Sequence, residues 1–100
     1  MSVKTTNRLY FVVRTDVGLG RAMAQAIHAM DEWSARYGPQ RGTVIVYGVG
    51  SERELLDLVP DGGRTILWRE PDLKDQATAF ATDACRRNLP LLGQEERRAA

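Results

Sequence analysis

The sequence contains a single cysteine, Cys85, and a single histidine, His28, among its 100 residues. A lone cysteine cannot form an intramolecular disulfide, and one histidine without further cysteines is a poor ligand set for a metal. Apolar runs such as 9–13 are too short to span a membrane. No long apolar segment follows Lys4, so no secretory signal is expected. These absences predict a cytoplasmic protein without a disulfide, metal or membrane partner.

The chain also lacks a strong excess of charge. It has 14 Lys and Arg against 13 Asp and Glu, a net charge of +1. A bulk basic field, which marks many nucleic-acid-binding proteins, is therefore absent, and nucleic-acid binding would need a local patch of cations. The length fits one domain. We expect it to span residues 8–92, between a flexible N-terminus, 1–7, and a flexible C-terminal tail, 93–100.

Strand and helix patterns alternate along the chain. The unbroken apolar run 8–14 is typical of a central strand that is covered on both faces. The connection 70–76 is too short for a helical crossover, so the strands on either side of it should be antiparallel. The pattern predicts an α/β fold: a single three-layer α/β/α domain with a mixed, largely parallel four-stranded sheet. Its expected strands are 8–14, 43–50, 64–69 and 77–81, its expected helices are 18–37 and 51–59, and 83–88 is a possible further helical piece.

Hydrophobic periodicity predicts the core. Ser51 precedes Glu54 by three residues, a capping-box pattern that opens the second helix. That helix should bury Leu55, Leu56 and Val59. The aromatic residues Tyr10, Trp33, Trp68 and Phe80 could stack on nucleobases, but their apolar surroundings favour core packing. The first helix should bury a stripe made of Met23, Ala26, Ile27, Met30, Trp33 and Tyr37.

A two-glycine turn, Gly18-Leu19-Gly20, leads from the first strand into the first helix. The third glycine of a dinucleotide fingerprint would fall at Met23, and no Lys-Ser or Lys-Thr pair follows the turn. Classical dinucleotide and nucleotide-triphosphate sites are therefore not expected. Two interpretations remain open: ordinary turn geometry, or a turn whose N–H groups cradle an anion at a helix start.

Arg21, Gln25 and His28 follow at spacings of four and three, so they share one face of the first helix. A cation in the first turn opposes the helix dipole unless an anion lies nearby, and Asp16 is the nearest candidate partner. The three side chains could form a polar binding ridge. The alternative is that Arg21 is solvated, Gln25 is a surface amide and His28 is a hydrogen-bonded core histidine.

An acidic loop, Glu70-Pro71-Asp72, directly follows the third strand. If that strand runs parallel to the first, this loop and the glycine turn lie at the same edge of the sheet, where open α/β sheets bind ligands. A carboxylate there could orient water or act as a general base. Turn formation by Pro71 and Asp72 is the alternative explanation.

The first of these segments resembles the second, archaeal- and eukaryotic-type class of peptidyl-tRNA hydrolases. That class has a strand ending in Arg-x-Asp, a turn with glycine and lysine, and a helix reading roughly Ala-Ala-Gln-x-x-His-Ala. Here the same order reads Arg14-Thr15-Asp16, then Gly18-Leu19-Gly20-Arg21, then MAQAIHA from Met23. SERELLDL resembles the family's second-helix region, and ILWREPD its third strand and catalytic loop. The resemblance covers residues 8–92.

The resemblance implies a three-layer α/β/α domain that forms a homodimer and needs no cofactor or metal. It implies hydrolysis of the ester that joins a peptide to the 3′ acceptor end of tRNA. Water would attack the ester carbonyl, with a donor for the oxyanion. The implied catalytic residues are Arg21, Glu70, Asp72 and Thr78, and the implied substrate-binding residues are Arg14, Asp16, Gly20, Gln25, His28 and Arg69.

The chain departs from the family pattern at three places. Arg21 stands where the family has a functional lysine, the turn is about two residues shorter, and the loop 70–75 replaces Asp-Ala-Gly-(Arg/Lys)-Thr-Gln. Glu70 or Asp72 would then take the place of the family aspartate, and Thr78 that of its threonine. Two alternatives remain: a non-catalytic tRNA- or RNA-binding or regulatory dimeric module on the same fold, or a structural dimer without a nucleic-acid partner.

Overall fold

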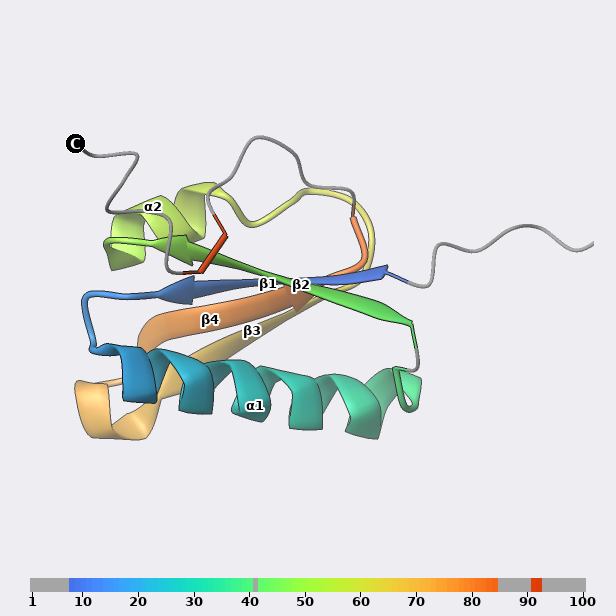
Figure 1. The fold of residues 1–100 in the computed structure, drawn as a ribbon, viewed down its shortest axis with the longest axis horizontal. Helices are drawn as coiled ribbons and strands as arrows, with labels where there is room; N and C mark the ends of the chain where they lie inside the picture. Colours follow the sequence, from blue (N-terminus) through green and yellow to red (C-terminus); the bar gives the residue numbers. More distant parts are fainter. Residues whose placement is uncertain (1–7, 41, 85–90, 93–100) are drawn as a thin grey trace, which may run out of the picture.

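The computed structural model describes residues 8–40, 42–84 and 91–92 (Figure 1). All of the firmly predicted strands and helices are present, with ends within two residues of the predicted ones. Of the possible helical piece 83–88, Asp83 and Ala84 are not helical, and 85–88 lie outside the described residues, as do 1–7 and 93–100. The elements are β1 (Arg8–Arg14), α1 (Leu19–Tyr37), β2 (Thr43–Val49), α2 (Glu52–Asp57), β3 (Thr65–Glu70), the 3-10 helix η1 (Pro71–Leu73) and β4 (Gln76–Thr82).

The four strands form one mixed sheet in the order β2-β1-β4-β3. β1 and β2 are parallel, whereas β4 runs antiparallel to both of its neighbours, β1 and β3. The predicted antiparallel pairing of the last two strands is confirmed. Because β4 lies between β1 and β3, two of the three hydrogen-bonded pairs are antiparallel, fewer parallel pairs than expected. β1, β2 and β3 nevertheless share one direction, so their carboxyl ends meet at one edge of the sheet.

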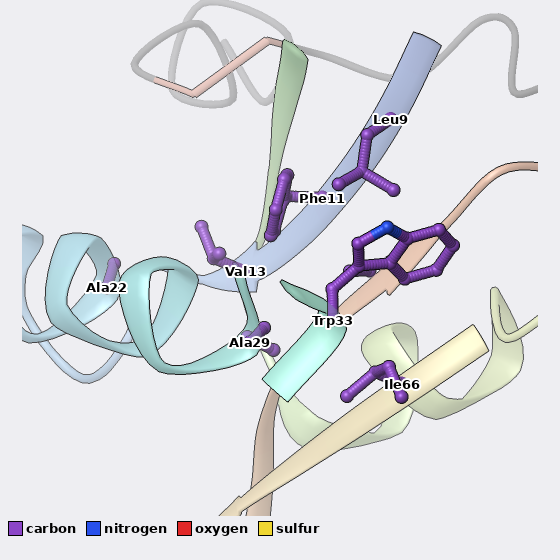
Figure 2. Close-up of a cluster of buried hydrophobic side chains, with 9 residues drawn as sticks. Leu9, Phe11, Val13, Ala22, Ala29, Trp33 and Ile66 are labelled. Carbon is purple, nitrogen blue, oxygen red and sulfur yellow. The ribbon is translucent and has the colours of Figure 1, made fainter. Parts of the chain in front are cut away.

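The two helices pack on opposite faces of this sheet. In Figure 2 the alternate β1 residues Leu9, Phe11 and Val13 gather with Trp33 of α1. The intervening residues, such as Val12, pack on the other side with Leu55 of α2. Both sets are almost completely buried. β1 is therefore covered on both faces, as its unbroken apolar sequence predicts.

The predicted core stripe of α1 is wrong in two positions, because Met23 and Ile27 are 53% and 67% exposed. The helix is rotated so that it buries Ala22, Gln25 and Ala29, together with Trp33, for which the prediction is confirmed. Small alanine side chains allow a close approach to the sheet, and Gln25 finds a hydrogen-bond partner there. In α2 the prediction for Leu56 is also wrong, since its side chain is exposed.

Candidate functional site

The turn before α1 is built on Gly18. This residue has a φ of 96°, a left-handed value that glycine adopts without steric cost. Its N–H donates to the Thr15 carbonyl at 3.0 Å, and its own carbonyl accepts from the Ala22 N–H at 2.9 Å. Gly20 lies within the first turn of α1, and a Cβ added there would meet no atom within 4 Å. Turn geometry accounts for Gly18, while internal packing does not require Gly20.

Thr78 lies in a β-bulge of β4. Trp68 of β3 pairs with Ala79, but the next residue, Arg69, pairs with Ala77, so Thr78 has no partner in the register. A bulge of this kind turns an extra side chain toward one face of a sheet. Here that face is the one covered by α1, because the Thr78 hydroxyl bonds to Gln25 of that helix.

Gln25 links the bulge to the acidic loop. The Thr78 Oγ1 donates to Gln25 Oε1 at 3.1 Å, and the two residues are 0% and 3% exposed. Gln25 also hydrogen-bonds the Glu70 carboxylate. Because an ionised carboxylate only accepts hydrogen bonds, the Gln25 Nε2–H group is the donor. The hydroxyl of Thr78 thus fixes which end of the Gln25 amide faces Glu70.

The Glu70 carboxylate accepts further hydrogen bonds. Its Oε1 accepts from the Asp72 N–H at 3.3 Å, and its Oε2 lies 3.5 Å from the indole Nε1 of Trp68. The hydrogen bond from Gln25 lowers the pKa of Glu70 below its ordinary value; burial opposes this, and the Asp72 N–H, Trp68 and the charge of His28 add to it. Glu70 is therefore an anionic acceptor at neutral pH.

His28 and Trp68 form a ring stack beside this carboxylate. Their centroids are 4.7 Å apart and their planes differ by 18°. His28 is exposed, so the alternative prediction of a core histidine is wrong. Gln25 is buried, so the alternative prediction of a surface amide is wrong as well. Trp68 is only partly buried, unlike Tyr10, Trp33 and Phe80. The spacing of Trp68 and Glu70 on one strand could have indicated that they share a face.

Arg14 and Asp16 form a separate structural cluster. Arg14 is buried and donates through Nε and Nη2 to the Asp16 carboxylate, through Nη1 to Gln76 Oε1, and again through Nη1 to the Ala77 carbonyl. The hydrogen bond to Arg14 lowers the pKa of Asp16, although burial opposes this. Asp16 thus pairs with Arg14, and the prediction that it is the partner of Arg21 is wrong. Sequence reasoning missed Gln76 in this cluster.

The remaining predicted site residues do not all lie in one cluster. Arg21 is exposed, and its side chain makes no hydrogen bond or ion pair with residues in the described ranges. Arg69 alternates with Trp68 and Glu70 along β3 and donates through Nη1 to the Asp75 carbonyl at 3.2 Å. Its side chain thus leaves the strand on the opposite face of the sheet. Gln25, His28, Glu70 and Thr78 are brought together, with Arg21 on the same helix face.

Within the part of the chain that the structure describes, no three His, Cys, Asp or Glu side chains are grouped as a metal site. No described helix is both long enough and apolar enough to cross a membrane. No protein-family model matches this chain, and neither does any curated protein.

Proposed function

We propose that this protein hydrolyses the ester between a peptide and the 3′ end of tRNA. One observation carries the proposal. The resemblance to peptidyl-tRNA hydrolases assigns roles to Gln25, Thr78 and one carboxylate of the loop, which come from three separate segments of the sequence. In the structure Gln25, Glu70 and Thr78 form one hydrogen-bonded network. A buried hydroxyl and a buried amide thereby hold an accessible carboxylate in a fixed position and in its charged form.

In the proposed reaction, Glu70 orients a water molecule toward the ester carbonyl carbon. A new carbon–oxygen bond forms, the bond to the ribose oxygen breaks, and that oxygen leaves with a proton. The lowered pKa of Glu70 suits a hydrogen-bond acceptor that orients water better than a strong general base. We assign this role to Glu70 and not Asp72, because Asp72 contributes its backbone N–H to holding Glu70.

Arg21 is the proposed cation of the site. It lies one helical turn before Gln25, so both side chains leave α1 on the same face. A free guanidinium there can bind the oxyanion or a phosphate of the tRNA end. Arg14 is a poorer phosphate ligand, because four of its N–H groups already donate within the chain. We therefore assign Arg14 and Asp16 to holding the strand ends at the site.

The three-layer arrangement, the cellular location and the homodimer belong to the same proposal. The placement of one helix on each face favours a three-layer α/β/α domain, and a tRNA substrate favours a cytoplasmic location.

For the proposed homodimer, α1 offers an exposed apolar stripe of Leu19, Met23 and Ile27. Their equal spacing of four lets two antiparallel copies place Met23 against Met23 and Leu19 against Ile27. Sedimentation of Met23→Glu, with Ala35→Glu on the outer side of α1 as the matched control, tests this arrangement.

Turnover of purified peptidyl-tRNA is the direct test. The wild-type protein should release free tRNA, Glu70→Gln should lose most of this activity while it still binds tRNA, and Asp72→Asn should keep it. Arg21→Lys should retain or raise activity, since it keeps the cation. Unchanged turnover in Glu70→Gln would contradict the assigned role. Salt-sensitive tRNA binding without turnover would instead favour the non-catalytic module. Neither binding nor turnover would exclude both nucleic-acid functions.

A further inference from the structure

The ring stack of His28 and Trp68 has one face open. Trp68 packs partly against the core and covers one side of the imidazole. His28 itself is exposed, so the other side of its ring is accessible. The near-parallel planes, 18° apart, make a flat platform at the junction of α1 and β3. A further aromatic ring can extend such a stack in the same direction.

This platform lies beside the proposed catalytic carboxylate. The indole Nε1 is 3.5 Å from Glu70 Oε2, and His28 follows Gln25 by one helical turn. In peptidyl-tRNA the ester is attached to the ribose of the last nucleotide. The base on that same ribose must therefore lie within one nucleotide's reach of Glu70 during the reaction.

We propose that the His28–Trp68 stack binds the unpaired 3′-terminal nucleobase of the tRNA on the open face of His28. This inference rests on the proposed function, because the base can be located only if the ester on the same ribose lies next to Glu70. Trp68 acts as a positioning residue that holds the imidazole parallel to the incoming base. Every base has an aromatic face, so the platform senses the presence of a base and not its sequence.

The test compares the binding of two single-stranded RNA oligonucleotides that end in CCA and differ only in whether the 3′-terminal base is present. We expect the complete oligonucleotide to bind about tenfold more tightly than the abasic one. His28→Ala should abolish this preference, so that the two oligonucleotides bind equally. His28→Phe, which keeps a ring, should restore the preference. Equal affinities in the wild type, or a preference that survives in His28→Ala, would overturn the proposal.

A spectroscopic signal separates stacking from a change in folding. In Trp33→Phe the emission of Trp68 is the only tryptophan signal, since the sequence has two tryptophans. The complete oligonucleotide should quench it more than the abasic one does. Trp68→Leu should lose the preference, and if that variant does not fold, the pair His28→Ala and His28→Phe decides, because His28 is a surface residue.

Turnover measured in parallel separates this inference from the proposed function. If the protein cleaves peptidyl-tRNA but binds the two oligonucleotides equally, only the stacking proposal is overturned. A preference for the base without any cleavage supports the stack and overturns the hydrolase. No binding of either oligonucleotide overturns the stack whatever the turnover shows.

Discussion

Replacing Thr78 by valine tests the polar network most directly. Valine keeps the shape and the β-branch but removes the hydroxyl that donates to Gln25 Oε1 at 3.1 Å. Thr78 is 0% exposed and Gln25 is 3% exposed, so water cannot readily replace the lost donor. The unsatisfied buried oxygen costs about 1–3 kcal/mol, and the added methyl group returns up to about 0.8 kcal/mol. We expect a net loss of about 1–2 kcal/mol in the free energy of unfolding.

The same substitution should change the pKa of Glu70, although Glu70 itself is not replaced. Without the hydroxyl, nothing fixes which end of the Gln25 amide faces the carboxylate, so the hydrogen bond that most lowers the pKa of Glu70 is weakened. The pKa of Glu70 should rise toward its ordinary value. Urea unfolding measures the stability, and an NMR titration of the Glu70 side-chain carbon measures the pKa.

Thr78→Ser is the matched control. It keeps the hydroxyl and loses a methyl group, so it should cost about 1 kcal/mol in stability while the pKa of Glu70 stays lowered. Two results would contradict the assigned role of the Thr78 hydroxyl: Thr78→Val leaves both stability and the Glu70 pKa unchanged, or Thr78→Ser raises that pKa as much as Thr78→Val does.

Three further outcomes are expected. Arg14→Lys keeps the charge but cannot make all four hydrogen bonds to Asp16 and its other acceptors, so urea unfolding should show a loss of about 1–3 kcal/mol. The Asp16 pKa is lowered in the folded state, so its stabilisation is complete above its unfolded pKa of about 3.9 and is lost as pH falls through the folded pKa. Unfolding measured between pH 3 and 7 should thus show a steeper acid decline for the wild type than for Asp16→Asn. Ser51→Ala removes the oxygen that caps the Glu54 N–H and should lower the thermal midpoint through a loss of about 1 kcal/mol.

Local patterns accounted for most of the elements. The unbroken apolar run of β1, the Ser51 cap of α2 and the short loop between β3 and β4 each act over a few residues, and each prediction was confirmed. The rotation of α1 was not predictable in this way. Met23 is a better core residue than Gln25 by hydrophobicity, yet Gln25 is buried, because a threonine 53 positions further along supplies its partner.

Short-range patterns were thus enough to predict the strands, the helices and their order, and they singled out the segment from Arg14 to His28 as a candidate binding site. They also marked Glu70 as a carboxylate at a strand end. In contrast, the folded chain was needed to see that Asp16 pairs with Arg14, that a bulge turns Thr78 toward α1, and that Trp68 stacks on His28. Helix and strand signals repeat over short stretches of chain and can be recognised there. Hydrogen bonds and ring stacks between distant segments depend instead on sheet order, register and helix rotation, which no single segment encodes.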